Sequence, residues 1–174
     1  ARRLSNKEIP PVIARLIGDE KIVAVLPIGK KELYSGVIEM LKERNAAHKE
    51  AGEIKDSDIK ASSLIIIGND NPLIERLYGK PEIIEAGFSI TVRNNPWNQQ
   101  KVVAIINGRT KEEIDTAFRK IFHYGKYSAL AFDRGKNIYK RTDESGRGIA
   151  VNLFEQPMAV EVSALKTLND VINS

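Results

Sequence analysis

The chain has 174 residues, of which 42% are hydrophobic and 29% are charged, and its formal net charge is +4. This length suits one domain with a substantial core. A membrane-spanning helix needs about 20 apolar residues, and no apolar run in the sequence approaches that length. The absence of cysteine excludes disulfide bonds, thiolate catalysis and cysteine-ligated zinc within these residues. The sequence starts at Ala1 without an initiator methionine or apolar leader, so we expect one domain excised from a larger protein.

A short apolar run that ends in a Gly- or Asn-rich turn occurs three times, as IVAVL, LIII and VVAII. Continuous apolar runs without alternation are typical of strands that are covered on both faces. We therefore predict parallel central strands at residues 21–26, 62–67 and 101–106. The fold class expected over residues 1–174 is a three-layer α/β sandwich, Rossmann-like or flavodoxin-like, with antiparallel hairpins at the sheet edges.

In the N-terminal half, helices are expected around these strands. Ser5 and Glu8 match a capping box for a first helix, which Gly18 ends. An amphipathic pattern predicts a long helix from about residue 31 to 50, and the polar residues 53–60 read as a loop. A short helix opens at Asn71-Pro72 and stops at Gly79.

In the C-terminal half, the pattern changes to shorter strands. Residues 88–92 alternate between apolar and polar types, and the loop 94–100 joins them to 101–106, which predicts an antiparallel hairpin. Thr110 and Glu113 form a second capping box. The remaining expectations are a β-meander from strands at 127–132, 137–141 and 149–154, and a final helix at 163–172.

The carboxyl ends of parallel strands are where ligands settle in open α/β sheets. The candidate residues there are Gly29, Lys30, Gly68, Asn69, Asp70, Asn107, Gly108 and Arg109. Free backbone N–H groups beside Lys30 and Arg109 would suit a phosphate or carboxylate. However, tight turns and helix caps require the same residue types, and this structural interpretation is the one we favour. Neither G-x-G-x-x-G nor a P-loop occurs.

No constellation in the sequence predicts catalysis. A G-x-S-x-G elbow is absent, and His48 and His123 belong to different predicted helices without an H-E-x-x-H motif. We therefore expect no catalytic residue, no metal site and no cofactor in this chain.

Trp97 is the single tryptophan, and it lies in the polar loop of the predicted hairpin. An exposed tryptophan at a hairpin tip would anchor a partner. Alternatively, the loop folds back and Trp97 covers the end of the sheet. We favour the packed arrangement because an isolated exposed tryptophan lowers solubility.

The basic excess lies between residues 101 and 147, where eleven basic residues face six acidic ones. Such a region suits an anionic partner. A solvated surface of mixed charge is the alternative that we favour, because no aromatic nucleic-acid motif accompanies it. Nucleic acid is therefore not an expected partner.

Three stretches together resemble a known module: LIIIGNDNPL at 64–73, GFSITVRNNPWNQQKVVAII at 87–106 and FHYGKYSALAF at 122–132. They are similar to a Rossmann-like accessory module of large exported bacterial proteins that also carry an aminopeptidase-N-like zinc peptidase domain and a ChaN-like haem-binding domain. The resemblance implies a periplasmic or extracellular accessory domain whose partners are neighbouring domains of the same polypeptide. It carries over no functional residue.

Two functions follow as expectations. The first is a non-catalytic accessory or interaction domain of a larger exported bacterial protein, for which the resemblance implies an association with a peptidase. The second is a domain that binds a small or anionic ligand through the loops at the carboxyl ends of its strands.

Overall fold

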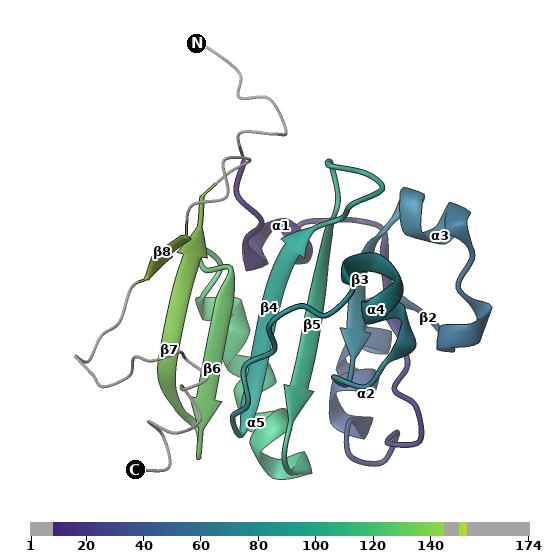
Figure 1. Ribbon diagram of the computed structural model, residues 1–174. Helices are drawn as coiled ribbons and strands as arrows, with labels where there is room; N and C mark the ends of the chain where they lie inside the picture. Colours follow the sequence, from purple (N-terminus) through teal and green to yellow (C-terminus); the bar gives the residue numbers. More distant parts are fainter. Residues whose placement is uncertain (1–8, 145–149, 153–174) are drawn as a thin grey trace.

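The computed structural model describes residues 9–144 and 150–152 and contains one eight-stranded mixed sheet with helices on both faces (Figure 1). The strands are β1 (Ile22–Val25), β2 (Ala47–Lys49), β3 (Ser63–Ile67), β4 (Phe88–Asn94), β5 (Val102–Gly108), β6 (Ala129–Asp133), β7 (Lys136–Asp143) and β8 (Ala150–Asn152). The α-helices are α1 (Ile13–Ile17), α2 (Ser35–Glu43), α3 (Asp56–Ala61), α4 (Pro72–Tyr78) and α5 (Lys111–Lys120), with 3₁₀ turns η2 (Ala51–Glu53) and η3 (Ile121–His123).

The strand order is β2-β1-β3-β5-β4-β6-β7-β8, and the sheet divides into a parallel and an antiparallel half. Strands β2, β1, β3 and β5 run parallel. Strand β4 runs antiparallel to both β5 and β6, and β6, β7 and β8 follow as a meander. The predicted α/β class, the three parallel central strands and the hairpin of residues 88–106 are confirmed.

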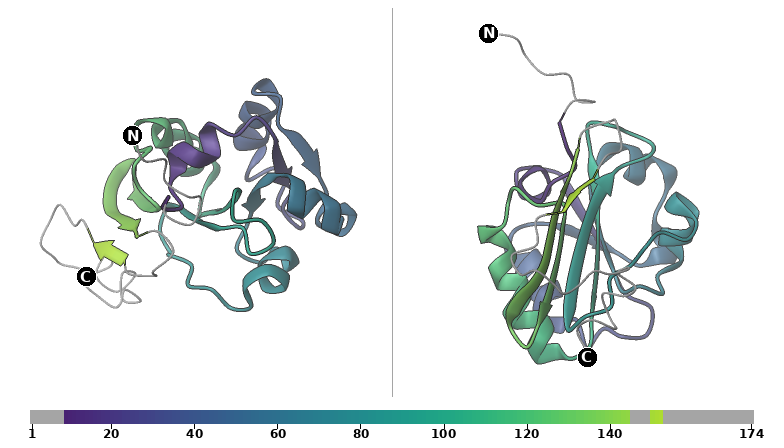
Figure 2. Two further views of the ribbon diagram at one scale, coloured as in Figure 1. Left: turned by 90° about the horizontal axis from the view of Figure 1, so that it is seen from above. Right: turned by 60° about the vertical axis from the view of Figure 1, so that its left-hand side comes forward.

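Strands β1, β3 and β5 are largely buried because helices cover both of their faces, whereas the edge strand β2 is more exposed. Strand β3 shows this most clearly, since its five residues are at most 3% exposed. Ile65 and Ile67 pack in the larger core, whereas Leu64 and Ile66 pack in a second core on the opposite face. Helices α1, α2 and α5 supply the larger core, while α3 and α4 supply the second (Figure 2). A run without alternation is therefore what a doubly covered strand requires.

The predicted helix from residue 31 to 50 is wrong in its length. Helix α2 ends at Glu43, and strand β2 follows and pairs in parallel with β1. Asn45 adopts a left-handed φ of 62°, a conformation that asparagine tolerates better than most residues. The Asn45 and Ala46 N–H groups donate to the carbonyls of Lys42 and Leu41, which is the Schellman pattern that terminates a helix.

The predicted loop at residues 53–60 is also wrong, because it contains helix α3. The Asp58 carboxylate accepts a hydrogen bond from the Lys55 N–H at 2.9 Å and caps this helix. Ile54 and Ile59 are both buried in the second core. These two apolar residues anchor an otherwise polar segment to the sheet.

The helix ends predicted at two other places agree with the structure. Asn71 caps α4, Gly79 ends it, and Thr110 caps α5 by accepting a hydrogen bond from the Glu113 N–H. In the N-terminal segment, the described helix is α1, which begins at Ile13. The capping box at residues 5–8, the end of the last predicted strand and the final helix at 163–172 lie outside the described residues.

The substitution Asn71→Ala is expected to lower the free energy of unfolding by about 2–4 kcal/mol. It removes a helix cap, which contributes about 1 kcal/mol, and a buried donor, whose loss costs about 1–3 kcal/mol. Asn71 is 2% exposed and donates to the carbonyls of Leu26 (3.0 Å) and Ile67 (3.4 Å). Urea denaturation measures the change. The control Asn69→Ala removes one 3.4 Å hydrogen bond to Glu85 and should change stability by less than about 0.5 kcal/mol. Equal effects for both variants would contradict the prediction.

Candidate functional site

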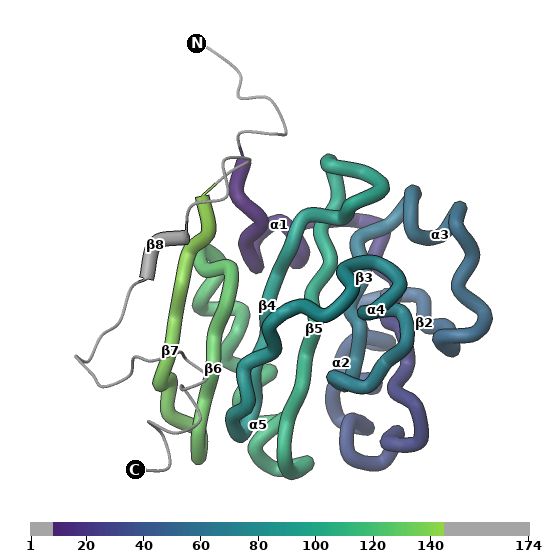
Figure 3. The backbone as a smooth tube through the Cα atoms, viewed as in Figure 1, coloured from purple at the N-terminus to yellow at the C-terminus, as the bar shows by residue number. Residues whose placement is uncertain are grey.

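The candidate site lies where the connections of the parallel sheet diverge. After β1 the chain leads into α2, which packs in the larger core, whereas after β3 it leads into α4 on the opposite face (Figure 3). Strands β1 and β3 are nevertheless direct neighbours. Two adjacent strands whose connections leave on opposite faces define a topological switch point at their carboxyl ends, which is the usual ligand position in this architecture and is called the crevice below.

The crevice has a rigid floor. The Asn71 amide group bridges the carbonyl of Leu26, just after β1, and that of Ile67, at the end of β3. Its side-chain oxygen accepts a hydrogen bond from the Leu73 N–H at 3.1 Å. Gly68 adopts a φ of 94°, and a Cβ there would lie 3.1 Å from Asp70 Oδ1. This position therefore favours glycine for conformational reasons.

The first two loops bring four of the predicted site residues together. Lys30, which follows Gly29, forms an ion pair with Asp70 across the crevice, with 3.4 Å between Nζ and Oδ2. Both side chains remain 47% exposed. Asn69 donates a hydrogen bond of 3.4 Å to Glu85 Oε1. The rim of the crevice therefore carries one ammonium group, one amide and two carboxylates.

The third loop reaches the crevice through a tyrosine. The Tyr34 hydroxyl accepts a hydrogen bond from the Gly108 N–H at 3.2 Å and donates to Asn107 Oδ1 at 3.4 Å. Gly108 itself serves packing, because a Cβ there would lie 2.2 Å from Ile114 Cγ1. Burial raises the pKa of Tyr34, and the negative charges of Asp70 and Glu85 raise it further. The hydrogen bond from Gly108 lowers the pKa but does not outweigh these effects. The hydroxyl thus stays protonated.

Arg109 is directed away from Lys30. Its guanidinium pairs with Asp133 at the end of β6, with 3.2 Å between Nη2 and Oδ1, and its N–H donates to the Gly87 carbonyl. The residues of the loop 107–109 therefore contact two different parts of the molecule. Asn107 and Gly108 contact Tyr34, whereas Arg109 joins the antiparallel half of the sheet.

Two residues of this rim, Tyr34 and Glu85, were not among the sequence candidates. Tyr34 lies one turn beyond Lys30 and is 1% exposed, and the amphipathic pattern of its segment predicts a helix without indicating that its hydroxyl reaches the third loop. Glu85 belongs to the segment between α4 and β4. No short-range pattern connects that segment to β3, so tertiary contacts alone bring it there.

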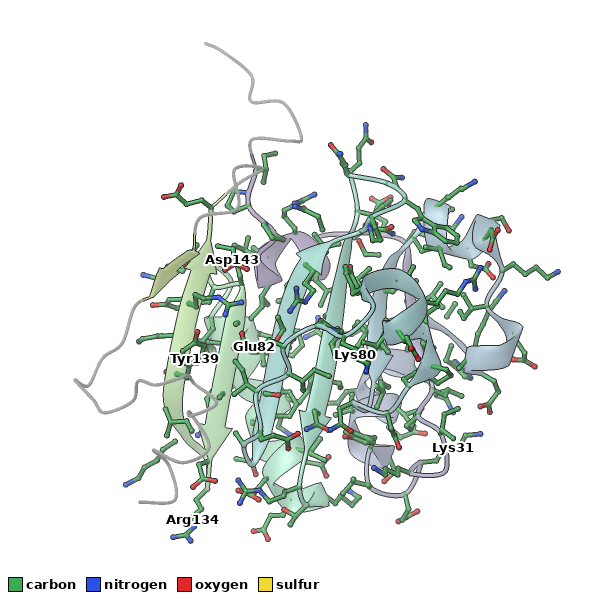
Figure 4. The ribbon with its side chains drawn as sticks, in the orientation of Figure 1. Lys31, Lys80, Glu82, Arg134, Tyr139 and Asp143 are labelled. Atoms are coloured by element: carbon green, nitrogen blue, oxygen red, sulfur yellow. The ribbon has the colours of Figure 1, made fainter. Side chains whose placement is uncertain are left out.

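A second hollow adjoins the crevice on the side of β2. It is lined by Pro27, Ile28, Gly29, Lys31, Glu32 and Glu50. Ile28 is 49% exposed and is the exposed large hydrophobic residue of the described part of the chain. Lys31, which extends from this end of the molecule (Figure 4), pairs with Glu50. Both lysines near the carboxyl end of β1 thus have a carboxylate partner.

Trp97 lies at the opposite end of the sheet from these loops and is partly buried. It packs against the second core, and the Arg76 guanidinium lies 5.1 Å from its ring centroid. Its N–H donates to Asn95 Oδ1, while the fully buried Asn95 amide donates to the carbonyls of Ile59 and Ser62. The loop thus folds back onto the sheet, which agrees with the packed arrangement.

Several basic residues of the 101–147 region have local acidic partners. Lys101 pairs with Asp19, Lys111 with Asp115, and Arg141 with Asp143 and Glu82. Figure 4 shows Glu82, Tyr139 and Asp143 near one another on the front of the antiparallel half. Four basic residues of this region, Arg109 among them, thus form ion pairs with carboxylates.

A polar network closes the amino ends of the parallel strands. The Asp19 carboxylate accepts hydrogen bonds from Lys101 Nζ (2.9 and 3.0 Å), Ser63 Oγ (2.6 Å) and the Lys21 N–H (2.9 Å). Burial alone would raise the pKa of Asp19, but these hydrogen bonds and the charge of Lys101 outweigh it and lower the pKa below its ordinary value. The ionised carboxylate therefore stabilises the fold.

Comparisons with protein-family models, with curated proteins and with solved structures find no match. Within residues 9–144 and 150–152, no group of three or more histidine and acidic side chains is placed to hold a metal ion. In the same residues, no helix has both the length and the apolar character needed to cross a membrane.

Asp19→Asn is expected to lower the free energy of unfolding at pH 7 by about 1–3 kcal/mol, the cost of weakening a charged, partly buried hydrogen-bond network. Because the pKa is lower in the folded chain, the contribution is fully present above the ordinary value of 3.8 and is lost as the pH falls through the folded-state pKa. Urea denaturation from pH 7 to pH 2.5 should show the two proteins converging below about pH 4.

The matched control is Glu20→Gln, which alters an exposed neighbouring carboxylate. It should change stability by less than about 0.5 kcal/mol at every pH. A difference between wild type and Asp19→Asn that stays constant down to pH 2.5 would rule out ionisation as its cause.

Proposed function

We propose that this chain is a binding domain whose small ligand lies in the crevice between the carboxyl ends of β1 and β3. The observation that carries the proposal is the divergence of the two connections to opposite faces, because this topology leaves the strand ends uncovered. Lys30, Asn69 and Asp70 all lie on the rim. The bridging amide of Asn71 keeps the two strand ends at a fixed separation.

The chemistry of the rim favours a ligand rich in hydroxyl groups. Asp70 and Glu85 supply acceptors, the Asn69 amide supplies a donor and an acceptor, and Lys30 supplies a donor. A phosphate or carboxylate ligand would have to displace Asp70 from Lys30 and lie near Glu85. A sugar or other polyol meets no such repulsion and can accept from Lys30 while donating to the carboxylates. We therefore favour the polyol over the anion.

A second proposal concerns the setting of this domain. We propose that it acts without catalysis as an accessory domain of a larger exported protein, in the periplasm or outside the cell. The three stretches that resemble the accessory module contain β4 and most of β3, β5 and β6, which are four consecutive neighbours in the sheet. Stretches separated in sequence thus form one contiguous centre, and this supports a common Rossmann-like module associated with peptidase domains.

Thermal unfolding with added ribose, glucose, glycerol or inorganic phosphate tests the ligand proposal. A sugar at 100 times its Kd should stabilise the wild type by about 2.7 kcal/mol. Asp70→Asn removes a carboxylate from the rim and should weaken sugar binding at least tenfold. The control Glu39→Gln alters another exposed, ion-paired carboxylate, which contacts Lys42 on α2, and should leave binding unchanged. Stabilisation by phosphate with none by sugars would contradict the polyol assignment.

The accessory role is tested with the purified chain and with the source cells. The purified chain should hydrolyse no peptide from a library of fluorogenic aminopeptidase substrates. An antibody against this chain should detect the protein in the periplasmic or extracellular fraction. Reproducible hydrolysis, or recovery in the cytoplasmic fraction alone, would contradict the proposal.

A further inference from the structure

A cavity that is separate from the crevice lies within the larger core, beneath α1, α2 and α5. Its volume is about 130 Å³. Nine apolar residues line it: Leu16, Ile17, Ile22, Leu41, Ala46, Ile65, Phe118, Ile121 and Phe122. In Figure 1 these three helices lie behind the sheet, whereas α4 lies in front of it. An apolar cavity of about 150 Å³ in another protein stays dry and admits benzene, so this space suits a group of about six carbon atoms.

Two charged residues, Asp19 and Arg44, also line the cavity. The Asp19 carboxylate is engaged by Lys101, Ser63 and the Lys21 N–H. The Arg44 guanidinium lies 4.0 Å from the centroid of the Phe122 ring, at the wall of the cavity. Among the described residues, no carboxylate forms an ion pair with Arg44. Its charge is therefore available to a ligand.

Arg44 also lines a groove between α2 and α5, which shares Phe122 with the cavity. Arg119 lies in this groove and likewise forms no ion pair with any described carboxylate. The acidic residues of the groove are Glu39, Glu43 and Asp115, of which Glu39 pairs with Lys42 and Asp115 with Lys111. Where the cavity meets the groove, the unpaired groups are thus two guanidiniums and the Glu43 carboxylate.

We propose that this cavity binds a small carboxylic acid with an aromatic ring or a short alkyl chain. The apolar part fills the space below Phe122, and the carboxylate pairs with the Arg44 guanidinium at the wall. Arginine suits this role because its planar fork matches a carboxylate and stacks on an aromatic ring. The hydrogen bonds that end α2 position the backbone at residue 44, and the stacking on Phe122 places the guanidinium at the cavity. The site is independent of the crevice.

Isothermal titration with benzoate, benzyl alcohol and acetate tests this site. Benzyl alcohol keeps the ring without the charge, and acetate keeps the charge without the ring. Benzoate should bind at least tenfold more tightly than either probe. Arg44→Gln should weaken benzoate at least tenfold and leave benzyl alcohol unchanged, whereas Ala46→Leu, which fills the cavity, should abolish the binding of both.

The matched control is Arg76→Gln, which removes the guanidinium that stacks over Trp97 and should leave benzoate binding unchanged. Ala46→Val replaces Ala46→Leu if the latter does not fold, as judged by circular dichroism. Equal affinity for benzoate and benzyl alcohol, or an Arg44→Gln variant that still binds benzoate as the wild type does, would overturn the carboxylate assignment. Absence of benzoate binding to the wild type would overturn the site.

Discussion

The structure depends on the burial of β3 from both sides. Four consecutive residues of this strand, 64–67, contribute to two separate cores, and its neighbours β1 and β5 lie within the same two layers. A polar residue at any of the positions 64–67 would therefore leave an unpaired group in one core or the other. Helices α2 and α4 occupy opposite faces because each covers one side of these strands. The crevice at their carboxyl ends is a direct consequence of that arrangement.

Two buried asparagine side chains hydrogen-bond backbone groups at the two ends of the parallel strands. Asn71 at the carboxyl ends donates to carbonyls at the ends of β1 and β3, and Asn95 at the opposite end donates to carbonyls at the end of α3. Each side-chain oxygen also accepts a nearby N–H. Both ends of the parallel strands are thus closed by a residue that satisfies several backbone groups at once. At the crevice, the backbone groups below the rim are already hydrogen-bonded by Asn71, so the charged side chains of the rim are not needed for that purpose.

The central strands were predictable because burial on both faces leaves a direct mark, an apolar run without alternation. The helix caps Asn71 and Thr110 were equally predictable from the sequence, because each cap interacts only with residues close to it in the chain. Helix α3 was not, because only Ile54 and Ile59 in a polar stretch signal that it packs on the sheet. The early end of α2 depends on one asparagine in a left-handed conformation, which an amphipathic pattern does not register.

The candidate crevice was predictable in position but less so in composition. Lys30, Asn69 and Asp70 follow from the strand ends, since the carboxyl ends of parallel strands meet at one edge. Tyr34 and Glu85 are brought to the crevice by tertiary contacts. Arg109 does not contribute to the crevice because it pairs with Asp133 on β6. Local sequence specifies which turns lie together, whereas the direction of each long side chain depends on charges that are distant in the chain.

The division of the sheet into two halves has a consequence for how the chain reaches its native state. The pairs β4–β5, β6–β7 and β7–β8 each join strands that are consecutive in the chain, so forming each pair closes only a short connection. The parallel half pairs β3 with β5 across the whole of α4 and β4, and such pairing loses more chain entropy before it gains contacts. We therefore expect the hairpins to form first, with β5, which pairs with both β4 and β3, as the edge on which the parallel strands then assemble.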